Sequence, residues 1–155
     1  MPLGYITSII WENLGFNKFN DYLSVLNASQ RRNIKRERKA IAEKCIQMQP
    51  LTGDHITNHL LGLVYDFYAD ACDKFGGWGS KYLTKRFFEF LYNYRYRVML
   101  IAAYDEINKH QPLGMSFCLY KNEYLYGRYW GSCEDINNLH FDVCYYIALA
   151  HSTAI

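Results

Sequence analysis

The sequence predicts a single α+β domain, a sheet flanked by helices, and three observations point to it. The chain has 155 residues, half of them hydrophobic, which is enough to bury one core. Its first two thirds contain several segments whose apolar residues recur at helical spacing. Residues 97–130 instead hold three short apolar or alternating segments separated by polar turns, a pattern typical of an antiparallel meander.

Two helices are expected in the N-terminal segment, residues 1–44. The first covers residues 18–26 and places Phe19, Tyr22, Leu23 and Leu26 on one face. The second follows a cap at residues 27–29 and runs to Lys44 with a thin apolar stripe. Residues 31–44 contain seven Lys or Arg and two Glu, a local charge of +5 that leaves the rest of the chain at −3. The basic charge is thus a patch on one helix, and residues 45–155 form the domain that carries the sheet.

The middle of the chain is expected to form one strand and two helices. Residues 45–53 alternate apolar and polar side chains before a turn, which indicates a short strand near a sheet edge. Helical periodicity then runs from residue 57 or 58 to Phe75, where GGWGS breaks the helix as a hinge. The next helix covers residues 81–94, is capped by Ser80, and is expected to turn Leu83, Phe87, Phe90 and Leu91 inward.

The expected meander has the strands Arg97–Tyr104, Leu113–Tyr120 and Glu123–Trp130. The first is a near-continuous apolar run, which suits a strand covered on both faces. The third is aromatic and is followed by a polar loop. The last segment is an amphipathic helix that begins near Asn138 or His140 and has Leu139, Val143, Ile147 and Ala150 on one side.

Composition and cysteine spacing exclude several classes of protein. The five cysteines are odd in number and include no CxxC pair, which argues against a disulfide framework or a zinc ribbon. His55 and His59 stand at i, i+4, but a third ligand is not evident, so no metal site is expected. The N-terminus lacks a basic segment, and no window approaches the roughly 18 apolar residues of a membrane span. We therefore expect a cytoplasmic protein without a membrane span.

Polar and ionisable side chains collect where the third meander strand gives way to the last helix. His140 is the candidate general base, since an imidazole can have a pKa near working pH, and Asp142 could orient it or an ammonium group. Both are the candidate catalytic residues, with Tyr145 and Tyr146 beside them as candidate substrate contacts. The alternative is structural: Asp142 stabilises the helix start and His140 is an ordinary hydrogen-bonding residue.

The strand before this junction carries the other candidate substrate contacts, which are Tyr126, Arg128, Tyr129 and Trp130. On a regularly alternating strand Tyr126, Arg128 and Trp130 share one face. That arrangement could hold an anionic group by the guanidinium while rings pack the apolar part of a ligand. The alternative is a local cation–π pair between Arg128 and Trp130 or Tyr126.

The basic helix is a weaker candidate for phosphate binding, through Arg31, Arg32, Lys35 and Arg36. Phosphates of an aminoacyl-tRNA or of a nucleotide-linked precursor would need such a patch, and binding would weaken steeply with salt. The alternative is a solvated helix face with surface ion pairs of small worth.

The chain resembles the FemAB-like family of peptidoglycan-related N-acyltransferases in several sequence segments. These are WENLGFNKFNDYL, SQRRNIKRERKAIAE, KFGGWGSKYLTKRFFEFL, and the pair LYGRYWG and LHFDVCYYIA. The resemblance extends from Trp11 to Ala150. It implies a GNAT-like domain with a mixed sheet, whose first half matches the expected element order. It also implies transfer of an acyl or aminoacyl group to an amine on a small molecule or a cell-wall precursor.

The candidate donors that the resemblance implies are acyl-CoA and aminoacyl-tRNA, the latter with the basic helix as its contact. Residues 131–138 lack the Arg/Gln-x-x-Gly-x-Gly pattern that presents backbone N–H groups to the CoA pyrophosphate, so acetyl-CoA is not supported. Family members continue with further strands, whereas this sequence stops at Ile155. We therefore expect a C-terminally incomplete sheet that supplies half of the cleft.

The sequence thus favours an N-acyltransferase, and two alternatives stay open. One is a non-catalytic module for binding or self-association, which would complete its sheet with a second chain because an open strand edge is otherwise exposed. The other is a nucleic-acid binder that uses the basic helix.

Overall fold

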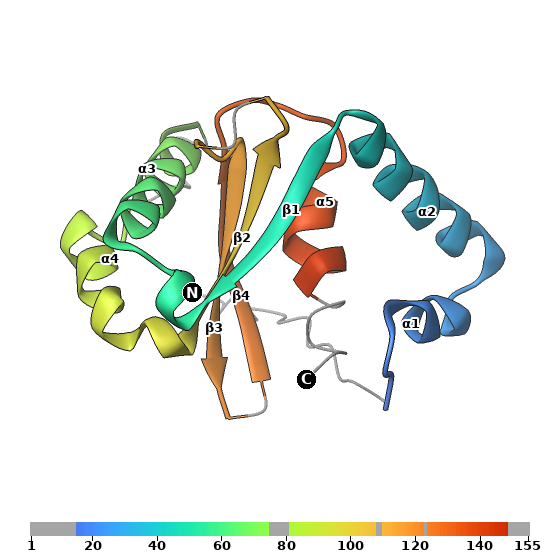
Figure 1. The fold of residues 1–155 in the computed structure, drawn as a ribbon, viewed down its shortest axis with the longest axis horizontal. Coiled ribbons are helices and arrows are strands. Elements are labelled where there is room, and N and C mark those ends of the chain that lie inside the picture. Colours follow the sequence, from blue (N-terminus) through green and yellow to red (C-terminus); the bar gives the residue numbers. More distant parts are fainter. Residues whose placement is uncertain (1–14, 75–80, 108–109, 123, 149–155) are drawn as a thin grey trace, which may run out of the picture.

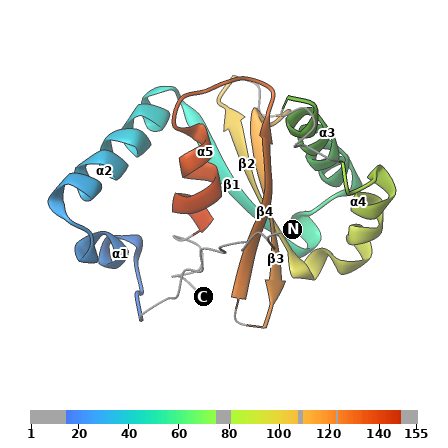
Figure 2. The same ribbon diagram turned by 180° about the vertical axis from the view of Figure 1, so that it is seen from behind.

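The computed structural model describes residues 15–74, 81–107, 110–122 and 124–148. In these residues a twisted sheet has helices on both faces (Figure 1). Helices α3 and α4 cover one face, and α5 covers the other, with α1 and α2 beyond it; the view from behind shows the same arrangement (Figure 2). The predicted α+β class is confirmed. None of the described helices is both long and apolar enough to cross a bilayer.

The sheet is an antiparallel meander with strand order β1-β2-β3-β4. Its strands are β1 (Ile46–Thr52), β2 (Val98–Asp105), β3 (Gly114–Lys121) and β4 (Tyr124–Ser132). The short strand expected at an edge is β1, where Pro50 has no N–H to lose from a ladder. A parallel pair, which a mixed sheet needs, does not occur among these four described strands.

The first face of the sheet packs against α3 (Asn58–Lys74) and α4 (Lys85–Leu91). Thr57 caps α3 by accepting a hydrogen bond from the N–H of Leu60 at 3.2 Å. The core on this side includes Leu61, Val64, Phe67, Phe88, Leu100 and Phe117. The helix approaches β4 so closely that a Cβ added to Gly131 would lie 2.5 Å from the backbone oxygen of Phe67.

The second face packs against α5 (Leu139–Phe141), which continues as the π-helical turn η4 (Asp142–Tyr146). Leu139 and Val143 are fully buried there with Met99 and Ile101, as the sequence pattern predicts. The outer helices are α1 (Phe19–Val25) and α2 (Ala28–Glu43). Ile41 of α2 joins this second core, while a smaller third cluster of Leu23, Ile34 and Tyr146 joins α1, α2 and η4.

The helix expected over residues 81–94 is the main error in element bounds. Its α-helical part starts at Lys85 and then changes to the 3-10 helix η3 (Tyr92–Arg97). The late start has a tertiary cause, because the N–H of Leu83 donates to the Tyr68 hydroxyl of α3 at 3.2 Å. The expected inward residue Phe90 is 56% exposed and Phe88 is buried instead. GGWGS, with its cap Ser80, and Ala150 lie outside the described residues.

Candidate functional site

The expected polar junction is formed by the end of β4 and the start of α5. Asn138, with a left-handed φ of 70°, turns the chain into the helix. The Trp130 ring lies 5.6 Å from the His140 ring. Tyr145 stands perpendicular to His140, with 5.7 Å between the ring centroids. The structure therefore brings together three of the predicted residues, and we call His140, Trp130 and Tyr145 the junction site.

The imidazole of His140 is suited to accepting a proton. Its side chain is exposed to solvent, yet the surrounding rings bury it partly and lower its pKa below the ordinary value. Among the described residues no hydrogen-bond donor or acceptor engages either ring nitrogen. The ring is accordingly neutral near pH 7 with a lone pair available.

Asp142, the second predicted catalytic residue, points away from His140. Two residues along a helix differ by about 200° in direction, and Asp142 faces α2 instead. Its Oδ1 atom lies 3.3 Å from Nε of Arg38, and only 6% of the Asp142 side chain is exposed. Arg38 in turn stacks over the Phe19 ring at 4.7 Å. Asp142 therefore fixes the position of the last helix against α2.

The Asp142 carboxylate is buried at a cost. Although Arg38 is close, Oδ1 receives no hydrogen bond of acceptable geometry from any described residue. Burial raises the pKa of Asp142, and the Arg38 guanidinium only partly opposes that rise. The charged form is therefore less favourable in the folded protein than in the unfolded chain.

Asp142→Asn is expected to stabilise the protein slightly at pH 7, because burial raises the pKa of Asp142 and makes its charged form unfavourable in the folded protein. Arg38 is not left as a buried charge, since 37% of its side chain is exposed and it stacks over the Phe19 ring. A raised folded pKa means that the contribution of Asp142 to stability is present below its unfolded pKa and is lost as pH rises through the folded pKa. The gain should thus shrink toward pH 4. Urea unfolding at both pH values measures it. The exposed residue Asp135 provides the control Asp135→Asn, and a loss of stability at pH 7 in Asp142→Asn alone would contradict the prediction.

Tyr146 lies on a different side of the last helix from Tyr145 and packs against α1 and α2. It is buried, and its hydroxyl donates to Oε2 of Glu37 at 2.7 Å. Burial and this carboxylate raise the pKa of Tyr146. Around it, Tyr22, Leu26, Gln30, Asn33, Ile34 and Glu37 line a cavity of about 200 Å³. Of the two predicted tyrosines, only Tyr145 belongs to the junction site.

The prediction that Tyr126, Arg128 and Trp130 share one face is wrong, because β4 contains a bulge. Gly127 pairs with Cys118 while Tyr129 pairs with Phe117, so Arg128 is an extra residue in the ladder. Tyr129 packs on the α3 side against Tyr68 and Phe117. Trp130 packs on the α5 side. Arg128 lies 5.9 Å from the Tyr129 ring, not over either ring named in the cation–π alternative.

Tyr126 and Arg128 line a groove at the end of the sheet where β4 begins. The groove has a volume of about 580 Å³ and is lined by Arg97, Leu119, Tyr120, Lys121, Asn122, Tyr126 and Arg128. We call it the basic groove. None of its three cationic residues is in an ion pair with a described residue. It is separate from the junction site, which lies at the other end of β4.

The four basic residues proposed for phosphate binding do not form one set. Arg31 is engaged in structure, since its Nη1 donates to the carbonyls of Leu26 at 2.6 Å and Ser24 at 3.3 Å. It thereby closes the end of α1 against α2. Arg32, Lys35 and Arg36 are exposed on the outer side of α2.

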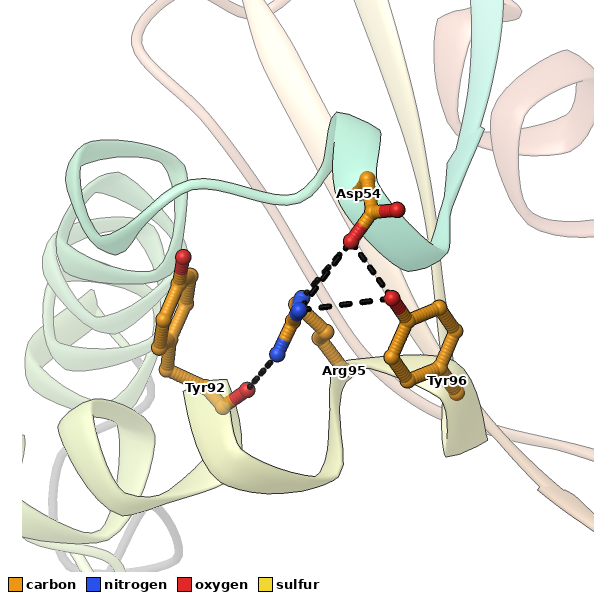
Figure 3. Close-up of polar contacts among 4 residues, drawn as sticks. All are labelled: Asp54, Tyr92, Arg95 and Tyr96. Atoms are coloured by element: carbon orange, nitrogen blue, oxygen red, sulfur yellow. Dashed lines mark hydrogen bonds and ion pairs between the residues drawn. The ribbon is translucent and has the colours of Figure 1, made fainter.

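A polar cluster that the sequence did not indicate links the 3-10 turn after β1 (Gly53–His55) to η3 (Figure 3). Asp54 Oδ1 accepts hydrogen bonds from Arg95 Nη2 at 3.0 Å and from the Tyr96 hydroxyl at 2.6 Å. The guanidinium lies between the rings of Tyr92 and Tyr96, at 4.9 and 4.6 Å. Those hydrogen bonds hold the pKa of Asp54 below its usual range. The cluster fixes η3, whose last residue is Arg97.

Some of the residues that were not predicted from the sequence could have been found from the expected strand order, and others could not. In an antiparallel meander the start of β2, the end of β3 and the start of β4 meet at one end of the sheet. Arg97 and Lys121 could therefore have been placed near each other, and near the first half of the strand that carries Arg128, from the expected strands alone. Arg38 and Glu37 could not, because their partners on the last helix are distant in the sequence and no local pattern joins them.

The fold and these surfaces define an α+β domain with a histidine-containing aromatic junction at one end of its edge strand and a basic groove at the other. The family model of FemAB-like proteins, described as peptidoglycan biosynthesis/recognition, matches residues 5–155. The chain belongs to this family, as the sequence predicted. A search of the curated proteins found no match.

Proposed function

We propose that the chain transfers an acyl or aminoacyl group to an amine of a cell-wall precursor, in a GNAT-like cleft beside the junction site. The family match supports the cell-wall context. The observation that carries the reaction is the solvent-accessible imidazole of His140 between Trp130 and Tyr145, where partial burial lowers its pKa. A nucleophilic amine must lose a proton during transfer, and a base with a pKa near or below working pH can take it.

In this mechanism the acceptor amine attacks the acyl carbonyl while His140 removes its proton. The new C–N bond forms, and the bond from the acyl carbon to the leaving oxygen or sulfur of the donor breaks. Trp130 and Tyr145 provide apolar walls for the substrate. Asp142 acts as a positioning residue, because its contact with Arg38 holds the helix that carries His140.

The donor in this proposal is an aminoacyl-tRNA or an acyl-CoA. For the tRNA, the exposed cations Arg32, Lys35 and Arg36 of α2 provide the phosphate contacts. Addition of salt should then weaken donor binding steeply if tRNA is the donor, and much less if the donor is acyl-CoA.

His140→Ala is expected to reduce transfer by about 10²–10⁴-fold, the usual loss on removing a general base. The assay supplies charged tRNA or acyl-CoA and follows acylation of a cell-wall precursor amine. His59→Ala is the matched control, since His59 is exposed on α3. Both variants should keep the wild-type unfolding midpoint. Undiminished turnover in His140→Ala would exclude the residue as the base.

The alternative function, a non-catalytic module for binding or self-association, has one observation in its favour. Among the described strands β4 has a neighbour on one side only, and an unpaired edge can accept a strand from a second chain. Light scattering during gel filtration distinguishes the two proposals when it is combined with the transfer assay. A chain that dimerises and acylates no amine would favour the module.

A further inference from the structure

We propose that the basic groove binds a small phosphorylated molecule with at least two negative charges, at a site distinct from the junction site. The groove is formed where β2 begins, β3 ends and β4 begins, and it contains Arg97, Lys121 and Arg128. This inference does not depend on the proposed acyl transfer. It concerns the other end of the sheet, where β4 begins.

The cations are brought together by the fold and not by neighbouring positions in the sequence. Arg97 ends η3, which Asp54, Arg95 and Tyr96 hold in place (Figure 3). Lys121 ends β3, and Arg128 is the bulged residue of β4. A bulge re-aims the side chain that it carries. The direction of the Arg128 side chain is therefore set by the bulge and not by the regular alternation of β4.

The charge of the groove points to an anionic ligand. The three cations are exposed and form no ion pair with an acidic residue in the described part of the chain. They give the groove a positive charge, which attracts a polyanion. Arginine forks match phosphate oxygens in pairs, and lysine adds a compact charge.

The remaining walls of the groove indicate an organic part on the ligand. Leu119 and Tyr126 supply apolar surface beside the cations, and Tyr126 is 46% exposed. Asn122, which has a left-handed φ of 55°, also lines the groove. The volume of about 580 Å³ lies within the range of small-molecule sites. A compact phosphate ester fits this combination better than an extended polymer, which needs a long basic track.

The groove and the junction site differ in the residues that line them. Tyr126 precedes the bulge and lies on the α3 side, whereas Trp130 follows it and packs on the α5 side. The groove lining includes none of His140, Trp130 and Tyr145. Variants at different residues therefore test the two sites separately.

The test measures the binding of inorganic pyrophosphate to the full chain by calorimetry, with citrate as a carboxylate probe of similar charge. The groove variant R97Q/K121Q/R128Q should bind pyrophosphate at least about tenfold more weakly, because each lost charge-assisted hydrogen bond typically costs that much. The control variant K74Q/K85Q/R86Q removes three positive charges from exposed positions on α3 and α4 and should bind as the wild type does. His140→Ala should also bind unchanged, which separates this test from that of acyl transfer.

Each outcome decides the proposal. Absence of pyrophosphate binding to the wild type overturns it, and so does an equal loss in the groove and control variants, which would show general charge attraction only. Citrate binding as tight as pyrophosphate, and lost in the groove variant, would replace phosphate by carboxylate and overturn the stated ligand class. Should the triple variant unfold, Arg128→Gln alone should still weaken binding several-fold, and an unchanged affinity there contradicts the proposal.

Discussion

Gly131→Ala is expected to destabilise the protein by about 3 kcal/mol, at the upper end of the usual cost of overpacking. The added Cβ would lie 2.5 Å from the backbone oxygen of Phe67 and 2.6 Å from its Cβ. These are main-chain and helix-fixed atoms, so no flexible side chain can move aside. Helix α3 would have to shift away from β4 and lose contacts along its whole length. Urea unfolding measures the change in the free energy of unfolding.

The same strand offers a matched control. Gly127 also lies in β4, but a Cβ built there meets nothing within 4 Å. Gly127→Ala should change stability by less than about 0.5 kcal/mol, since it removes backbone freedom from the unfolded chain and adds no clash. Equal effects of the two substitutions would show that the α3–β4 contact is not close at Gly131.

Phe88→Ala should cost about 3–5 kcal/mol, the range for emptying a buried aromatic site. Phe88 is fully buried. Its ring packs against Tyr65, Tyr68 and Phe117, with centroid distances of 5.8 to 5.9 Å. The loss would open a cavity at the centre of the core between α3, α4 and the sheet. A marginally stable domain would retain little of its stability, which thermal and urea unfolding would both reveal.

Phe90→Ala is the control for this prediction, on the same helix and with the same change of side chain. Phe90 is 56% exposed and its ring contacts Tyr94. Its loss should cost less than about 1 kcal/mol. The comparison also tests the structure, in which Phe88 is buried, against the sequence pattern, which predicted that Phe90 points inward. A larger loss from Phe90→Ala than from Phe88→Ala would favour the pattern.

Local patterns predicted the fold where local physics determines it. Helical spacing and caps located α1, α2 and α3, because a helix satisfies its own hydrogen bonds and buries one stripe. The capping box of Asn27 and Gln30 is an example, with hydrogen bonds of 2.9 and 3.2 Å. The start of α4 was missed because Tyr68 and Leu83 interact across the fold. Of its expected inward residues, Leu83, Phe87 and Leu91 do pack against the core, and Phe90 does not. Phe88 is buried as well, because Phe87 and Phe88 both fit a helical spacing with Leu91.

The candidate site was only partly predictable for related reasons. His140, Trp130 and Tyr145 come together because strand and helix are joined by a short loop, and proximity in sequence becomes proximity in space. Asp142 was paired with the wrong neighbour, because nothing in the sequence shows that Arg38 of a distant helix lies beside it. The grouping of Tyr126 with Trp130 failed at the bulge, which alternation rules do not foresee.

The bulge at Arg128 shifts the alternation of side chains in β4 by one residue. Before it, Tyr124 and Tyr126 are directed to the α3 side; after it, Tyr129 and Gly131 are. Deleting one residue at the bulge would turn every side chain of β4 on one side of it to the opposite face of the sheet. Either the wall of the basic groove or the close contact of Gly131 with α3 would then face the opposite layer. The number of residues between Tyr126 and Gly131 is therefore constrained by the packing of the two sheet faces, independently of the constraint on the identity of Gly131.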